Sequence, residues 1–287
     1  MEMAASNTTA AASYRAFRHP SLSRVHRVLK GASNAKVNPR SQEAFVATPV
    51  VSSAVGDASN MPLTANEGDN DDRLVTVCAG DGDDACTLGH VVLRSWNPSS
   101  STLVAAVIAG IATLPGITEG ATVLHLGAGA DGGYTSGFLS DLVGPSGTVV
   151  VVDSSTEKAE ALAAIARGRE NVVAVSEDAR RPEAYSASIP KGMVDCIVVG
   201  LRHADQARML EVNADVFLRA GGGVVYVVDA AAMASDDEGG NAACFKTYAD
   251  HVAALKGLGL KPREQITLEP YFERHAVITL VKPAPKD

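Results

Sequence analysis

The sequence has few cysteines, few aromatic residues and no apolar run near the ~20 residues that a membrane-spanning helix needs. Its four cysteines in 287 residues are too sparse for a disulfide framework and show no paired C-x-x-C spacing, which favours reduced thiols in an intracellular protein. They are Cys78, Cys86, Cys196 and Cys244. Because no histidine pair completes a site with Cys78 and Cys86, we expect no bound metal. We expect no membrane partner either.

Positive charge is scarce after the first 40 residues. Residues 1–40 hold seven of the 25 basic residues and one of the 33 acidic residues. The rest of the chain therefore carries 18 basic and 32 acidic residues, a formal charge near −14. A body this acidic should repel a nucleic-acid backbone unless its positive charges gather on one face.

The basic N-terminal segment is rich in Ser, Ala and Arg. From Leu22 onward, a helical spacing would separate an apolar arc from a basic arc. The apolar arc contains Leu22, Val25, Val28 and Leu29, and the basic arc contains Arg24, Arg27 and Lys30. This pattern predicts a mitochondrial transit peptide lost over roughly the first 30–40 residues. The alternative is a disordered basic tail that touches RNA, in which case a nucleolar location is open.

Residues 41–98 predict a small β-domain. Short apolar stretches such as 43–51, 73–79 and 90–96 alternate with turn-rich acidic ones. The stretch "DGDDA", residues 81–85, lacks the spaced ligands and closing glutamate of a calcium loop, so we interpret it as a hairpin turn.

From residue 99 onward, apolar strands alternate with helices, which predicts a mostly parallel sheet covered on both faces. Strands are expected at 122–129, 147–153, 171–178, 193–200, 223–229, 261–270 and 275–283. Helices are expected at 102–114, 156–168, 205–222 and 241–259. The last two strands are consecutive, which predicts a terminal antiparallel hairpin.

A glycine-rich loop follows the first of these strands. "LHLGAGADGGYTSG" places Gly127-x-Gly129-x-x-Gly132 between a strand and a helix. The second strand ends at Asp153, where an acid can accept both ribose hydroxyls, and Asp178 after the third strand could accept an adenine amino group. The loop could instead be a tight turn beside helix-capping acids, or part of a dinucleotide site. The terminal antiparallel hairpin fits a methyltransferase sheet better than an NAD domain.

The motifs in order resemble the fibrillarin family, the 2'-O-methyltransferases of box C/D ribonucleoproteins, from about Glu43 to the end. The stretches that carry the likeness are "RSWNPSSSTLVAAVIAG", "VLHLGAG", "SDLVGPSGTVVVVD", "SEDARRP", "MVDCIVVG", "NADVFLRAGG" and "TLEPYFERHAV". The resemblance implies a small β-domain that docks on a Nop-domain scaffold. It also implies a class I S-adenosylmethionine-dependent methyltransferase domain, with a Rossmann-like seven-stranded sheet. The expected divisions are 1–40, 41–98 and 99–287.

The resemblance places the cofactor site on matching positions. The family's glycine-rich loop falls on Gly127 to Gly133 and is two residues longer here. The other implied positions are Tyr134 and Thr135 for the paired threonines, Asp153 with Ser154 for the ribose, and Asp178 with Ala179 for the adenine. The loop after the fourth strand is changed to residues 200–203, "GLRH". We expect weak binding of S-adenosylmethionine.

The resemblance also implies a catalytic lysine, aspartate, second lysine and histidine, of which only His275 is present. Thr102, Gly200 and Asp229 stand at the other three positions. A ribose hydroxyl is a weak acid, so its methylation needs a group that draws off the proton and a cation beside the oxyanion. At Asp229 the charge is reversed, and a carboxylate there should repel an RNA phosphate.

Three functions remain open at this point. The lost groups favour a non-catalytic or weakly active component of a ribonucleoprotein assembly in rRNA processing or ribosome biogenesis, with His275 as a packing residue. Its partners would be Nop-domain-like or ribosome assembly proteins, and its contact with rRNA would depend on them. The alternatives are an active RNA 2'-O-methyltransferase that uses other residues, and a methyltransferase for another substrate.

Overall fold

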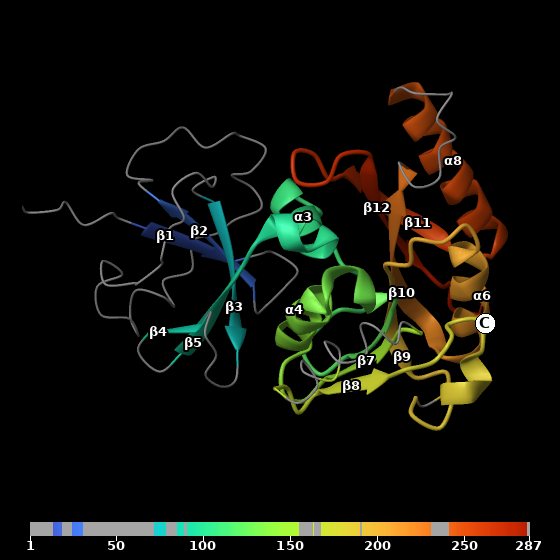
Figure 1. Cartoon of the computed structure of the whole chain (residues 1–287), viewed down its shortest axis with the longest axis horizontal. Coiled ribbons are helices and arrows are strands. Elements are labelled where there is room, and N and C mark those ends of the chain that lie inside the picture. Colours follow the sequence, from blue (N-terminus) through green and yellow to red (C-terminus); the bar gives the residue numbers. More distant parts are fainter. Residues whose placement is uncertain are drawn as a thin grey trace, which may run out of the picture.

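The described residues form two β-sheets that are joined in sequence by the segment after Trp96. A computed structural model describes residues 14–18, 25–30, 72–78, 85–88, 91–154, 163, 168–189, 191–230 and 241–285. The two sheets lie on either side of helices α3 and α4 in Figure 1. No helix in this described part of the chain is long and apolar enough to span a membrane.

The larger sheet has seven strands in the order β11-β12-β10-β9-β6-β7-β8. Their bounds are β6 Thr122–Leu126, β7 Thr148–Val152, β8 Val172–Val175, β9 Val194–Val199, β10 Leu218–Asp229, β11 Lys261–Thr267 and β12 His275–Val281. The strands β8, β7, β6, β9 and β10 are parallel, whereas β12 is antiparallel to both β10 and β11. The expected α/β fold with a terminal antiparallel hairpin is confirmed.

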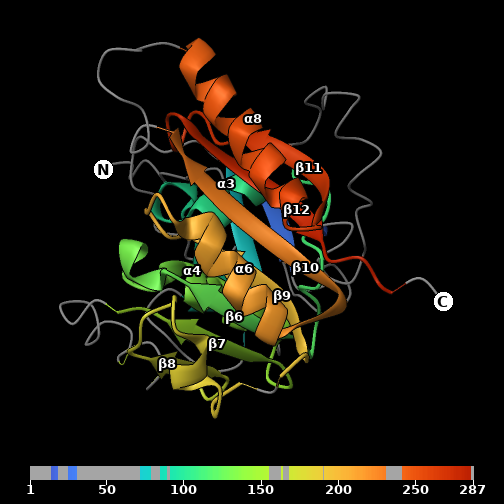
Figure 2. The ribbon, with the colours of Figure 1, turned by 90° about the vertical axis from the view of Figure 1, so that its right-hand side faces the viewer.

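Valine-rich strands bury both faces of this sheet. In β7, Val149 and Val151 belong to one buried cluster, and Val150 and Val152 belong to the other. This alternation follows from the two-residue period of a strand, and it explains why the sequence shows a continuous apolar run. Helices α3 (Thr102–Ala109) and α4 (Tyr134–Val143) pack on the first face. Helices α6 (Gln206–Val216) and α8 (Asn241–Gly257) cover the other face, which Figure 2 shows from the front.

Several elements differ from their expected bounds, and helix α6, expected over 205–222, ends at Val216. Helix α3 ends five residues earlier than expected because Gly110 takes a left-handed conformation, with φ 101°, and its N–H bonds the carbonyls of Ala106 and Val107. Strand β10 begins at Leu218 rather than residue 223, and its register against β9 shifts between Leu218 and Gly223. A Cβ on Gly223 would lie 1.8 Å from the Pro115 carbonyl oxygen, so only glycine allows this close approach. The helix expected at 156–168 falls almost wholly outside the described residues.

The smaller sheet has five strands in the order β1-β2-β3-β5-β4. Their bounds are β1 Tyr14–Arg18, β2 Val25–Lys30, β3 Asp72–Cys78, β4 Ala85–Leu88 and β5 Val91–Trp96. Strand β2 pairs antiparallel with both β1 and β3. The prediction of an amphipathic helix from residue 22 is therefore wrong. Two strands of the smaller sheet, β1 and β2, come from the segment predicted to be a transit peptide. The stretches 43–51 and 81–84 lie outside the described residues.

Trp96 fixes the end of the smaller sheet against α4. Its buried ring packs edge-on against Tyr134 and Phe138, with ring centroids 5.0 and 5.3 Å away. The guanidinium of Arg169 lies 5.9 Å from the Trp96 ring and is paired with the buried carboxylate of Asp141 at 2.6 Å. This packing holds the residues that follow Trp96 beside the N-terminus of α4, where the cavity described below lies.

Candidate functional site

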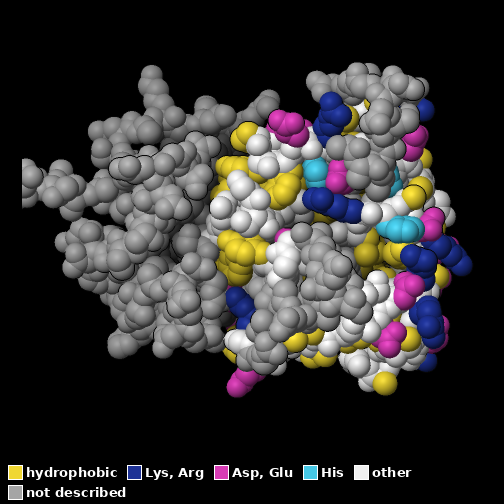
Figure 3. Space-filling model, viewed as in Figure 1, with side chains coloured by type: hydrophobic (Ala, Val, Ile, Leu, Met, Phe, Trp, Pro, Cys, Tyr) yellow, Lys and Arg dark blue, Asp and Glu magenta, His cyan; other side chains and the backbone are white. Residues whose placement is uncertain are grey.

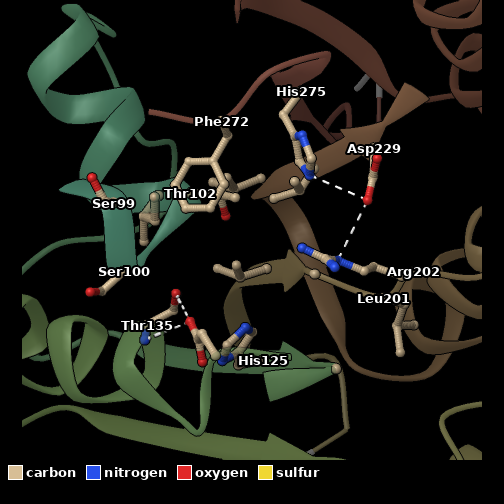
Figure 4. Close-up of a pocket in the computed structure, with 17 residues that line it drawn as sticks. Ser99, Ser100, Thr102, His125, Thr135, Leu201, Arg202, Asp229, Phe272 and His275 are labelled. Carbon is tan, nitrogen blue, oxygen red and sulfur yellow. Dashed lines mark hydrogen bonds and ion pairs between the residues drawn. The ribbon is translucent and has the colours of Figure 1, made fainter. Parts of the chain in front are cut away.

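A cavity of about 370 Å³ opens where the carboxyl ends of β6, β9 and β10 meet the N-termini of α3 and α4 (Figure 4). The carboxyl edge of a parallel sheet is where ligands bind in such folds. Its walls include Ser99, Ser100, Thr102 and Leu103 from the start of α3, and His125, Gly127, Asp131 and Thr135 from β6 to α4. The rest of the lining is Val198, Gly200, Leu201, Arg202, Val225, Val227, Asp229, Phe272 and His275.

The four positions that the resemblance assigned to catalysis all line this one cavity. They are Thr102, Gly200, Asp229 and His275. Thr102 lies in α3, Gly200 directly follows β9, and the other two lie in β10 and β12, so only the folded sheet brings them together. Among the described lining residues there is no lysine, and the cavity's permanent positive charge comes from Arg202.

Asp229 lies between the side chains of His275 and Arg202. The antiparallel register of β10 and β12 pairs Asp229 with His275, and the Asp229 Oδ2 is 3.3 Å from the His275 Nε2. The Nε of Arg202 lies 3.5 Å from the same carboxylate oxygen. Figure 4 shows both contacts, and Figure 3 shows a histidine, an acidic and a basic side chain side by side on this face. The permanent charge of Arg202 thus partly neutralises the carboxylate, which weakens the expected repulsion of an RNA phosphate.

Both ring nitrogens of His275 face oxygen acceptors. Its Nδ1 donates to the Glu273 carbonyl at 2.7 Å, and its Nε2 faces the Asp229 carboxylate without forming a regular hydrogen bond. The one retained position of the four is therefore held by a backbone carbonyl on one side and faces a carboxylate on the other.

Gly200 leaves an open space that His125 borders. A Cβ at Gly200 would lie 3.6 Å from His125 Nε2, an ordinary van der Waals distance. His125 is fully buried in β6, and its Nδ1 lies 2.9 Å from the Ser136 hydroxyl. Burial lowers the pKa of His125, while Asp131 and Asp153 oppose this shift. The imidazole is therefore neutral near pH 7.

The backbone of the glycine-rich loop is hydrogen-bonded to Asp131, an acid that sequence reasoning missed. Gly127 has φ 84°, and a Cβ there would lie 2.7 Å from the Leu201 side chain. Gly133 caps α4 with φ 84°, and Asp131 accepts hydrogen bonds from the backbone N–H groups of Gly133 and Thr135, each at 2.9 Å. An acid just before a helix start is a capping signal, so Asp131 could have been found. Gly129 lies in the short 3-10 turn Ala128–Asp131.

The other predicted cofactor residues lie outside the cavity lining. Asp153 and Ser154 follow β7, and Asp178 follows β8, so they occupy the same carboxyl edge of the sheet. Asp178 accepts from the Arg180 N–H at 2.9 Å, and the buried Ala179 accepts from Asn213 through its carbonyl at 2.8 Å.

Tyr134 has a structural contact of its own. Its hydroxyl accepts from the Asn97 N–H at 2.7 Å while its ring packs on Trp96. Of the predicted cofactor residues, Gly127 and Thr135 are the ones that line the cavity. No cluster of three or more metal-binding side chains is found in the part of the chain that the structure describes.

Comparison with known proteins supplies the family. The fibrillarin family model matches residues 64–283. The chain belongs to the fibrillarin family. It is 38% identical over 211 residues to the rRNA 2'-O-methyltransferase fibrillarin of Rattus norvegicus. The aligned region covers 73% of this chain and 60% of that protein. The chain thus matches less than two thirds of the length of this relative.

Solved fibrillarin structures share the fold. The Methanococcus jannaschii fibrillarin pre-rRNA processing protein aligns at TM-score 0.67 and 25% identity, covering 76% of this chain and 93% of that one. A fibrillarin in a fibrillarin/Nop5p complex aligns at TM-score 0.62 and 28% identity, over 74% of this chain and 95% of that one. Aeropyrum pernix fibrillarin, solved with natively bound S-adenosyl-L-methionine, aligns at TM-score 0.68 and 24% identity, over 94% and 99%.

Proposed function

We propose that this member of the fibrillarin family is a component of an RNA–protein assembly in rRNA processing or ribosome biogenesis. It would bind S-adenosylmethionine weakly and would not methylate ribose at an enzyme's rate. The observation that carries the proposal is the composition of the cavity wall. The four catalytic positions implied by the family converge there, but three of them hold Thr102, Gly200 and Asp229.

The geometry supports the loss of catalysis. Without a side chain at Gly200, no acid stands beside His125 at that point of the wall, and the neutral Thr102 offers no cation for a developing oxyanion. Asp229 pairs with His275 and Arg202, so the retained histidine and the cavity's permanent cation are both engaged by one carboxylate. A hydroxyl approaching this wall meets side chains that already contact one another.

Weak cofactor binding follows from what the carboxyl edge retains. Residues that can approach or bond an adenosyl group remain there, namely the positive-φ glycines Gly127, Gly132 and Gly133 with Asp153 and Asp178. The relative from Aeropyrum pernix was solved with this cofactor bound. When bound, the cofactor supplies an electrophilic methyl group, and these residues would hold its ribose and adenine.

The second candidate is an active RNA 2'-O-methyltransferase. The name of the rat relative favours it, as does the close Asp229–His275 contact, which could orient the imidazole. Methyl transfer separates the two functions. Purified protein with its native partner and RNA, supplied with tritiated S-adenosylmethionine, should incorporate no label into ribose above background. Incorporation that Asp153→Ala abolishes would establish the enzyme instead.

The partner is part of the same proposal. A relative is known in complex with Nop5p, and the five-stranded sheet offers this chain a second surface beside the methyltransferase fold. We place the protein in the mitochondrion on the strength of its Arg-rich first 40 residues. Cleavage after residues 30–40 would remove β1 and β2 and leave β3 with an unpaired edge, which a partner could cover.

A further inference from the structure

The N-termini of two helices meet at the wall of the cavity. Ser101 caps α3, with its hydroxyl accepting from the Val104 N–H at 3.3 Å, and Gly133 caps α4. Thr102 and Thr135, from the first turns of the two helices, both line the cavity. The unpaired amides and the dipole of a helix N-terminus attract anions, so this wall favours negative charge.

One carboxylate of the chain already occupies this wall. The two oxygens of Asp131 accept from the backbone N–H groups of Gly133 and Thr135, each at 2.9 Å. The Thr135 hydroxyl also donates to Asp131, and it therefore accepts in turn from the buried Ser101 hydroxyl at 2.7 Å. A directed chain of hydrogen bonds thus runs from the Val104 N–H through Ser101 and Thr135 to Asp131, and it links both helix starts to one negative charge.

The charges of S-adenosylmethionine decide what this means for a ligand. The molecule carries one anionic group, its carboxylate, together with an ammonium and a sulfonium. In this cavity the anion would go to the helix starts, but at α4 the amides of Gly133 and Thr135 are already bonded to Asp131. A second carboxylate at that place would face a like charge at short range and would lack donors, whereas the two cationic groups would be attracted.

We infer that Asp131 acts as a built-in substitute for the cofactor's carboxylate, and that the cavity selects adenosyl sulfonium compounds that lack a carboxylate. Decarboxylated S-adenosylmethionine represents this class. The inference rests on the proposed function, because it takes an adenosyl ligand to enter this cavity. It gives weak binding of S-adenosylmethionine a cause distinct from the residues around the ribose and adenine.

Calorimetric titration with S-adenosylmethionine and with its decarboxylated form tests the inference. The wild-type protein should bind the decarboxylated form at least as tightly. Asp131→Ala frees the two amides, so it should tighten binding of S-adenosylmethionine at least about tenfold and should not tighten binding of the decarboxylated form. Asp131→Asn keeps the size and one acceptor while removing the charge, and it should act in the same direction with a smaller effect. Asp215→Asn, at an exposed position on α6, is the matched control and should change neither affinity.

Each other outcome has a definite meaning. The inference would be overturned if Asp131→Ala and Asp131→Asn lost affinity for both ligands equally, with unchanged melting temperatures. Asp131 would then hold the ammonium group. Tenfold preference of the wild type for S-adenosylmethionine would also overturn it, as would unchanged affinities in both Asp131 variants. If the wild type binds neither ligand but Asp131→Ala binds S-adenosylmethionine, the inference stands. If no protein binds either ligand, the inference and the proposed cofactor binding fall together.

Discussion

Restoring the three replaced groups should create ribose methylation. The perturbation is the triple variant Thr102→Lys, Gly200→Asp and Asp229→Lys. Gly200 accepts a side chain, because the nearest atoms to a Cβ there lie 3.6 to 3.9 Å away and its φ lies outside the left-handed region. A new carboxylate at residue 200 would stand beside His125 Nε2, and a lysine at residue 229 would release His275 from its contact with the carboxylate.

The structure also sets the size of the effect. Removing one electrostatic group from an active site typically costs about 10²–10³ in rate, and such losses do not multiply when the groups act together. We therefore expect the triple variant to exceed the wild type by about 10³ or more. Asp229→Lys alone should gain less than about tenfold, because the acid at residue 200 is still missing. Arg202 should repel the new lysine only weakly, since its side chain is 58% exposed and can turn away.

The assay is transfer of tritiated methyl groups to RNA by the protein assembled with its native partner. The triple variant combined with Asp153→Ala is the control, and it should lose most of the gained activity at limiting cofactor because it binds the cofactor more weakly. The reasoning is refuted if the wild type already equals the triple variant. It is refuted too if the triple variant binds both cofactor and RNA and still transfers nothing.

Three further predictions follow from the same structure. Asp153→Ala should weaken S-adenosylmethionine binding at least about tenfold in calorimetry, since a charge-assisted hydrogen bond to a hydroxyl contributes ~1.5–3 kcal/mol; an unchanged affinity would place the ribose elsewhere. Burial lowers the pKa of His125 from 6.5, so on acidification the unfolded chain binds a proton at this histidine before the native chain does. The free energy of unfolding should therefore fall as pH drops below about 6.5. His125→Gln should flatten this fall in urea titrations, whereas the exposed control His203→Gln should not. Finally, we expect mitochondrial import with loss of roughly the first 30–40 residues; an intact N-terminus on the native protein, or a nucleolar tagged chain, would contradict this.

The order of strands and helices could be predicted because each element carries its own local signal. Valine runs such as Val149 to Val152 mark buried strands, and the glycines at 127–133 mark a strand that turns into a helix. The convergence of Thr102, Gly200, Asp229 and His275 was reached only through the family resemblance. Their positions lie far apart in sequence, and no local pattern reports which strands become neighbours.

The failures have physical causes as well. Residues 25–30 satisfy a helical arc in sequence, yet they form β2, because pairing with β1 and β3 outweighs a local helical pattern that is too short to form a stable helix alone. The partial neutralisation of Asp229 escaped notice because Arg202 comes from the loop after a different strand. Asp131 looked like one more polar residue of a glycine loop, and only the fold shows that its carboxylate bonds the start of α4.

The central claim is that this member of the fibrillarin family keeps the fold and part of the cofactor site without methylating ribose. Mapping of 2'-O-methyl groups on rRNA, with and without the gene, tests it most directly. The account predicts that no ribose loses its methyl group when the chain is removed, even where rRNA processing is impaired. It is contradicted by a site that loses its methyl group on deletion and regains it only with a chain in which Asp153 and His275 are intact.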